Sequence, residues 1–251
     1  MTEKQMKVFF EIHSDNPREG PGSNNSTRKA FSFIKNVSPS PTILDIGCGP
    51  GAQTMCLAGI TKGEITAVDN HKPFIDELNK NVEKAGLQKR VRSIVADMCK
   101  LDFEPDSFDC IWAEGCIYIL GVEKGLSLWK PFLKKNGIVA FTEITWLRDD
   151  IPEEVERFWK ENYPSISDIR GNIERIQKTG YELIDHFTLP EIDWWSQYYY
   201  YIEKKLETLD EKYRDDEEAY TILQMEKEEI SLYRRYSDYY GYVFYITRKK
   251  Q

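Results

Sequence analysis

A glycine-rich turn follows the first strongly apolar segment of the sequence. Residues 42–47 have the composition of a buried strand, and Gly47, Gly49 and Gly51 follow at two-residue spacing before a helical pattern over residues 51–59. Because glycine lacks a Cβ and readily adopts positive φ, such a turn lets the backbone approach a ligand closely. Glycines also build ordinary tight turns, so the motif alone leaves both interpretations open.

Acidic residues end the next two strand-like segments. Asp69 ends residues 64–69, and Asp97, followed by Met98, ends residues 91–97. In a doubly wound sheet the first acid lies beside the glycine turn, where it can accept hydrogen bonds from both hydroxyls of a ribose. Asp97 could accept from an adenine amino group while Met98 packs on the ring. The structural alternatives are a helix cap for Asp69 and an ordinary turn at Asp97.

These positions presuppose a sheet of alternating strands and helices. The expected strands are 42–47, 64–69, 91–97, 108–113, 137–145, 181–189 and 242–247. The expected helices are 51–59, 73–86, 122–135, 152–163 and 166–180. Strongly apolar strands separated by helices predict an α/β fold with a doubly wound, mostly parallel sheet that is covered on both faces.

Three further segments flank this alternation. A short helix is expected over residues 4–13, followed by a breaker-rich loop from Asp15 to Asn25 and a helix from Thr27 to about Asn36 with Ser26 as its N-cap. Residues 190–241 are too long for an ordinary loop and predict a helical insertion, which includes the aromatic run 194–201. We expect the loop and the aromatic run to close an acceptor pocket.

Composition restricts the classes of partner. The 251 residues fit a single domain, and 42 acidic against 34 basic residues give a net charge of −8, which repels nucleic-acid backbones and anionic lipids. No apolar run approaches a membrane span. The five cysteines lack a Cys-x-x-Cys spacing, and the three histidines are scattered. We therefore expect a cytoplasmic protein, monomeric or homodimeric, with no bound metal, membrane or nucleic acid.

With these motifs identified, the chain resembles the class I S-adenosylmethionine-dependent methyltransferases of the small-molecule type. The similarity rests on segments 44–51, 68–69, 96–98, 108–114 and 133–139, and it spans residues 42–145, continuing more loosely to the C-terminus. It implies a Rossmann-like seven-stranded sheet with an antiparallel C-terminal strand, formed by residues 242–246. The single domain would comprise residues 1–36 with the N-terminal helices and lid loop, 37–147 with the cofactor-binding core, and 148–251 with the insertion.

The resemblance also implies a cofactor site for S-adenosyl-L-methionine. Its residues would be Asp45, Gly47, Cys48, Gly49, Gly51, Asp69, Asn70, Asp97, Met98 and Glu114. The methionine moiety would contact the glycine turn, with Cys48 acting through its backbone and Asp45 lying just beneath. The turn departs from the Gly-x-Gly-x-x-Gly spacing of nicotinamide enzymes, which weakens an oxidoreductase interpretation. No Asn-Pro-Pro-Tyr follows the fourth strand, so methylation of amino groups on nucleic-acid bases loses support.

Methyl transfer requires orientation of two reactants more than a dedicated nucleophile. Glu114 and Tyr118, at the end of the fourth strand, are the candidate catalytic residues, and Glu143 and Trp146 could complete the pocket wall around a small-molecule acceptor. The alternatives are an NAD-dependent oxidoreductase, a non-catalytic protein that binds a nucleoside cofactor, and an RNA-modifying methyltransferase.

Overall fold

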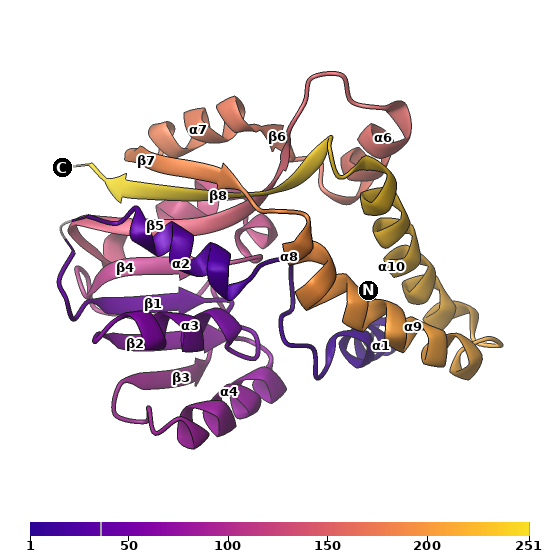
Figure 1. The fold of residues 1–251 in the computed structure, drawn as a ribbon, viewed down its shortest axis with the longest axis horizontal. Helices are drawn as coiled ribbons and strands as arrows, with labels where there is room; N and C mark the ends of the chain where they lie inside the picture. Colours follow the sequence, from indigo (N-terminus) through magenta and orange to yellow (C-terminus); the bar gives the residue numbers. More distant parts are fainter. Residues whose placement is uncertain (36, 251) are drawn as a thin grey trace.

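The computed structural model describes residues 1–35 and 37–250 and shows one eight-stranded sheet flanked by helices (Figure 1). The strand order is β3-β2-β1-β4-β5-β8-β7, and the two-residue strand β6 pairs with β5. The strands are β1 (Thr42–Ile46), β2 (Glu64–Asp69), β3 (Val91–Val95), β4 (Phe108–Ala113), β5 (Leu133–Trp146), β6 (Ser167–Asp168), β7 (Tyr181–Thr188) and β8 (Tyr240–Lys249).

Strand directions match the expected doubly wound sheet. The pairs β1–β2, β1–β4, β2–β3 and β4–β5 are parallel, whereas β8 is antiparallel to both β5 and β7. The prediction of a Rossmann-like sheet with an antiparallel C-terminal strand is therefore confirmed. In such a sheet, loops at the carboxyl ends of neighbouring parallel strands meet at one edge.

Helices cover both faces of this sheet. One face packs against α2 (Asn24–Ser32), α3 (Ala52–Ile60) and α4 (Lys72–Lys84), and the other against α5 (Val122–Trp129) and α7 (Ile169–Lys178). Fully buried residues of both cores include Ile43 and Trp112 on the first face and Leu44 and Trp129 on the second. Short 3-10 helices, η1 (Ile117–Ile119) and η2 (Lys130–Phe132), flank α5.

A helical lobe lies beyond the sheet, on the right of Figure 1. It contains α1 (Glu3–His13), α6 (Glu153–Asn162), α8 (Ile192–Trp194), the π-helix η3 (Trp195–Tyr199), α9 (Tyr200–Lys212) and α10 (Glu217–Tyr236). Its core joins Ile12 of α1 and Val155 of α6 to Leu223 of α10 and to Tyr240 of β8. The helical insertion before the last strand is confirmed.

Several boundaries differ from those expected. Helix α2 begins at Asn24 because Ser23, and not Ser26, is its N-cap, and the expected end at Asn36 lies outside the described residues. Helix α5 ends at Trp129 and not at residue 135, because Pro131 lies in the 3-10 helix η2 that follows it. Strand β5 therefore starts earlier than expected, at Leu133. The pattern over residues 166–180 divides into β6 and α7, because residues 167–168 pair with the end of β5.

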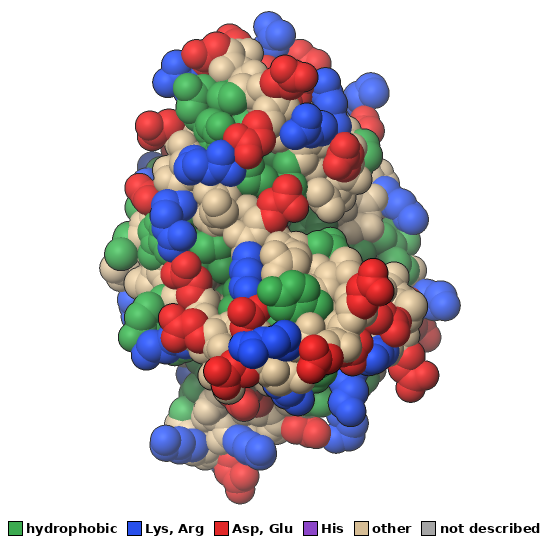
Figure 2. All heavy atoms as spheres, turned by 90° about the vertical axis from the view of Figure 1, so that its right-hand side faces the viewer, with side chains coloured by type: hydrophobic (Ala, Val, Ile, Leu, Met, Phe, Trp, Pro, Cys, Tyr) green, Lys and Arg blue, Asp and Glu red, His purple; other side chains and the backbone are tan. Residues whose placement is uncertain are grey.

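The face of the lobe in Figure 2 carries interspersed acidic and basic side chains. Pairs on this lobe include Arg234 with Glu203 and Arg235 with Glu154, at 2.6 and 2.7 Å. Basic side chains are thus matched by acids on this face. Among the described residues, no helix is both long and apolar enough to cross a bilayer.

Candidate functional site

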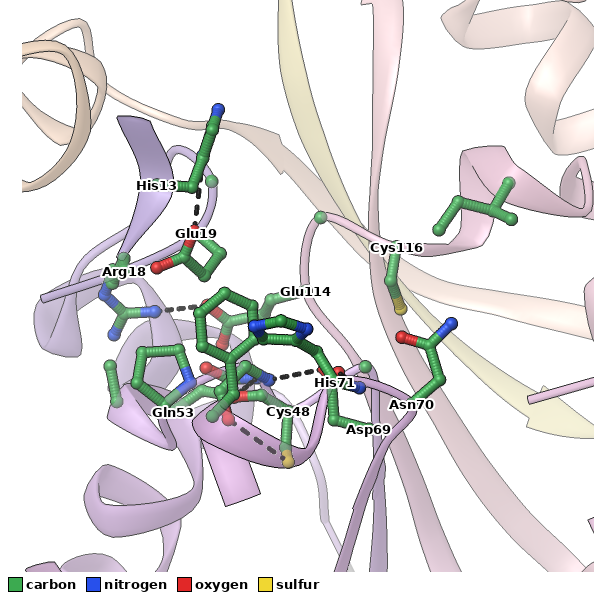
Figure 3. A pocket seen from close by; sticks show the side chains of 18 of the residues that line it. His13, Arg18, Glu19, Cys48, Gln53, Asp69, Asn70, His71, Glu114 and Cys116 are labelled. Carbon is green, nitrogen blue, oxygen red and sulfur yellow. Dashed lines mark hydrogen bonds and ion pairs between the residues drawn. The ribbon is translucent and has the colours of Figure 1, made fainter. Parts of the chain in front are cut away.

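A cavity opens where the turns after β1, β2 and β4 meet (Figure 3). The glycine turn contributes Gly47, Cys48 and Gly49. Gly47 and Gly49 have φ of 65° and 53°, and a Cβ on Gly47 would lie 2.6 Å from that of Cys116. Glycine is therefore required at position 47 both by its backbone conformation and by the close passage of the β4 loop.

Asp69 connects the glycine turn to the next helix. Its Oδ2 accepts a hydrogen bond from the Gly49 amide at 2.9 Å, and its Oδ1 accepts from the His71 amide at 2.8 Å. His71 is the N-cap residue of α4, so the contact with the helix start that the sequence left open does occur. Asp69 and Asn70 both line the cavity.

The end of β3 contributes apolar surface. Ala96 and Met98 line the cavity, whereas Asp97 is exposed and is not among the lining residues. The Oδ1 of Asp97 accepts from the Cys99 amide at 2.8 Å, and this hydrogen bond holds the pKa of the carboxyl below its usual range. Asp97 thus forms the polar turn that was considered as the alternative to adenine binding, and it is still accessible to a ligand.

Two of the expected cofactor residues lie beneath the cavity. Asp45 is fully buried, where its carboxylate accepts from Thr54 and Gln53, and burial raises its pKa to about 7 against the effect of those hydrogen bonds. Gly51 packs on α4, since a Cβ there would lie 2.3 Å from Cδ1 of Leu78. Neither residue is part of the cavity lining.

Glu114 is the centre of a buried polar network at the end of β4. Its Oε1 accepts from Trp112 Nε1 at 2.8 Å and from Thr27 Oγ1 at 2.7 Å, and its Oε2 accepts from Arg18 at 3.0 Å. Both side chains of the Arg18–Glu114 pair are only 5% exposed, and Arg18 also donates to Asn24. Glu114 therefore anchors the N-terminal loop over the cavity, as Figure 3 shows.

Helix α1, which precedes this loop, ends in a buried histidine at the site. His13 lies 3.2 Å from Glu19 and 3.3 Å from Glu226 of α10. Burial favours the neutral imidazole, but hydrogen bonds and charges of both carboxylates prevail and raise the pKa of His13 to about 9. The imidazole is therefore cationic at neutral pH.

Of the three remaining candidate residues, only one lines the cavity. Tyr118 lines the cavity and is 44% exposed. Glu143 is 1% exposed and Trp146 packs on Tyr240 in the core of the lobe, and neither is part of the cavity lining.

The sequence predicted that the loop from Asp15 to Asn25 closes the pocket, but it identified no side chain of the N-terminal segment as a site residue. Helix α1 and its following loop add aromatic and charged lining residues, namely Phe9, Phe10, His13, Arg18 and Glu19. Arg18 and Glu19 within a breaker-rich loop were the available signal, but Glu114, the buried partner of Arg18, lies 96 residues away. His13 and His71, which looked scattered along the sequence, both line the cavity.

Comparisons with known proteins agree with this arrangement. Residues 43–137 match the family profile described as a methyltransferase domain. The chain is 26% identical over 167 residues to a sterol 24-C-methyltransferase of Gibberella zeae, and 28% identical over 120 residues to that of Candida albicans. These alignments cover 62% and 47% of this chain but only 43% and 31% of the two relatives, so the chain spans less than half of their length.

A solved structure extends the likeness over the whole fold. The S-adenosyl-L-methionine-dependent methyltransferase from Geobacter sulfurreducens, determined with S-adenosyl-L-homocysteine, superimposes with a TM-score of 0.83. It is 19% identical, and the match covers 97% of this chain and 98% of that one. The helical lobe is therefore part of a shared architecture and not an irregular appendage.

Proposed function

Because the chain belongs to the class I S-adenosylmethionine-dependent methyltransferases, we propose that it transfers a methyl group from this cofactor to a small-molecule acceptor. The observation that carries the proposal is the cavity itself, in which the glycine turn, Asp69 and the Glu114–Tyr118 segment converge. Strand ends of a doubly wound sheet are where nucleotide-type ligands bind.

The residues present suit this cofactor. Each oxygen of Asp69 accepts one backbone hydrogen bond and keeps lone pairs for ribose hydroxyls. Met98 offers a face for the adenine ring, with Asp97 and Asn70 at its polar edge. The backbone of the turn would hold the methionine part, and Arg18 is a cation within the cavity that suits its carboxylate.

When bound, the cofactor would supply a methyl group on a sulfonium, whose carbon an acceptor nucleophile attacks in line while the neutral thioether of S-adenosylhomocysteine leaves. The chain's own contribution is to orient both molecules and exclude water. Glu114 fixes Arg18 and the loop, and Tyr118, which lines the cavity, is the residue that we assign to the acceptor side. Asp45 supports the turn from below through Gln53, which itself donates to the Cys48 carbonyl at 3.2 Å.

Calorimetric titration tests the proposal directly. We expect S-adenosylmethionine and S-adenosylhomocysteine to bind and NAD not to bind. Failure of both sulfur ligands to bind would overturn the proposal, and binding of NAD instead would favour an oxidoreductase. If the cofactor binds but labelled methyl is never transferred to any pool of small molecules or RNA, the non-catalytic alternative holds.

A further inference from the structure

Aromatic rings from two helices form one continuous wall of the cavity. Phe9 and Phe10 of α1 line it together with His71 and Phe74 at the start of α4, and we call these four residues the aromatic wall. Phe10 stacks on His71 with ring centroids 3.8 Å apart, and His71 meets Phe74 edge-on at 4.6 Å. Phe9 contacts Phe10 edge-on at 5.6 Å. Each member therefore touches another through a direct ring contact.

The aromatic wall is uncharged at neutral pH. Burial lowers the pKa of the His71 imidazole below its usual value, and the charge of Asp69 opposes this only in part. The ring on which Phe10 stacks is therefore neutral. Phe9, Phe10 and His71 are only half-buried, so part of their ring surface remains available to a ligand. Such a surface gains free energy when an apolar molecule covers it.

The segment after β4 adds apolar surface that the protein leaves uncovered. Tyr118 and Ile119 of η1 line the same cavity, and their side chains are 44% and 59% exposed. A single exposed isoleucine is ordinary on a protein surface. This one lies in the lining of a cavity that also holds the aromatic wall, so one ligand can cover both.

The charged side chains of the lining already have partners. His13 lies 3.2 Å from Glu19, and Arg18 lies 3.0 Å from Glu114, as the dashed lines in Figure 3 mark. The second oxygen of Glu19 has no hydrogen-bond partner among the described residues, but it is buried and so is not presented to the cavity. Asp69 accepts from two amides and is assigned to the ribose. A charged acceptor would therefore lose its hydration without gaining a free counter-charge from the described lining residues.

We propose that the acceptor has an uncharged, apolar skeleton, which packs against the aromatic wall and Ile119. Its affinity comes from hydrocarbon that leaves water, at about fourfold for each methylene group that is fully buried. The paired charges of the lining hold the N-terminal segment in place and are not recognition groups for the acceptor. This assignment rests on the proposed methyltransferase function and specifies its substrate class.

The first experiment varies the length and the charge of a probe. The full chain is saturated with S-adenosylhomocysteine, and butan-1-ol, hexan-1-ol, octan-1-ol, octanoate and n-octylammonium are titrated by ligand-observed NMR. We expect the affinity of the alcohols to rise by about twofold to fourfold per methylene group, and octan-1-ol to bind about tenfold more tightly than either ion. No gain with chain length, or an ion that binds as tightly as octan-1-ol, would overturn the proposal.

Variants then assign the gain to this cavity. Ile119→Ala and Phe9→Ala should each weaken binding of octan-1-ol about fivefold and leave the affinity for S-adenosylhomocysteine unchanged, because they remove only apolar lining. The control is Ile192→Ala, since Ile192 is 60% exposed, as Ile119 nearly is, but lies outside the lining. Unchanged octan-1-ol affinity in both lining variants, or equal loss in the control, would contradict the assignment. Weaker binding of S-adenosylhomocysteine alone would assign the aromatic wall to the cofactor and also overturn it.

The proposed function and the proposed substrate class fail differently. Absence of S-adenosylhomocysteine binding by the unmodified chain would overturn the methyltransferase proposal. Normal binding of that ligand without preference for the apolar probes would overturn only the substrate class. Phe9 packs on the core of the lobe, so Phe9→Ala is the variant more prone to misfold. If it does not fold, the exposed Ile119 and the comparison of probes on the unmodified chain still decide.

Discussion

At the scale of single residues, Asp69 serves both the fold and the proposed ligand. One oxygen of its carboxylate accepts from the Gly49 amide and the other from the His71 amide, so Asp69 connects the glycine turn to the start of α4. Neither contact uses all the lone pairs of these oxygens. Helix contact and ribose binding are therefore compatible roles of one side chain.

We expect Asp69→Ala to weaken binding of S-adenosylhomocysteine by about 1.5–3 kcal/mol, because hydrogen bonds to a charged acceptor are lost. Calorimetric titration measures the change. Asp76→Ala is the control, since Asp76 is exposed on α4 and pairs with Lys72, and it should bind normally. Unchanged affinity of a folded Asp69 variant would place the ribose elsewhere.

Glu143 is a residue whose negative charge opposes folding, because its carboxyl group is buried. Burial raises its pKa to about 8 from 4.5, although Tyr163 and Arg175 oppose the shift. The folded protein therefore binds this proton more tightly than the unfolded chain does. Its contribution to the free energy of unfolding must fall as pH rises from about 5 to about 8.

Glu143→Gln should remove that dependence. Relative to the unmodified protein, the variant should gain stability between pH 5.5 and 8.5, on the order of 1–4 kcal/mol. Urea unfolding at the two pH values measures the difference, with Glu182→Gln, an exposed site paired with Arg248, as the control. An identical pH profile for the variant and the unmodified protein would mean that Glu143 is paired or hydrated when folded.

At the scale of elements, the sequence was sufficient for the sheet but not for the site. The bounds of β2 and β4 were predicted to the residue, because their apolar runs end at Asp69 and at Ala113 before polar turns. Strand β6 was missed because two residues carry no periodicity and pair only where β5 passes. Arg18 and His13 were missed because Glu114 and Glu226 meet them only after folding.

The N-terminal loop and the insertion are joined by one buried acid. Asp193, 3% exposed and next to the aromatic run, accepts from the Ser26 hydroxyl, and its carbonyl accepts from the Gly22 amide at 3.2 Å. The loop lines the cavity, whereas Trp194 stacks on Tyr233 inside the lobe. The loop is therefore the main element of the proposed closure over the acceptor. The insertion contributes by binding the loop through Asp193.

Asp193→Ala should release this loop. We expect faster amide exchange in residues 15–23 and less protection of them by S-adenosylhomocysteine, because an unpaired buried hydroxyl costs about 1–3 kcal/mol. Asp210→Ala, at a more exposed site on α9 that pairs with Lys227, should leave exchange in the loop unchanged. Unaltered exchange in the Asp193 variant would show that other contacts hold the loop.

At the scale of the whole molecule, two strands belong to both the sheet and the lobe. Along β5, Ala140 lies in a core of the sheet and Ile144 in the core of the lobe. Along β8, Ile246 likewise lies in a core of the sheet and Tyr240 in the core of the lobe. Helix α1 adds Val8 and Ile12 to the lobe while its end lines the cavity, so neither part completes the site alone.

This sharing predicts that residues 1–251 unfold as a single domain. Scanning calorimetry should give one transition, and S-adenosylhomocysteine at about a hundredfold excess over its Kd should stabilise it by about 2.7 kcal/mol. For a chain of this length that corresponds to a rise in Tm of roughly 5–10 °C. Amide exchange should slow in both β1 and α10, because the ligand stabilises one cooperative unit. NAD serves as the control ligand and should leave Tm unchanged. Two transitions, with the ligand shifting only one, would mean that the lobe folds independently and that the shared strands do not couple it to the sheet.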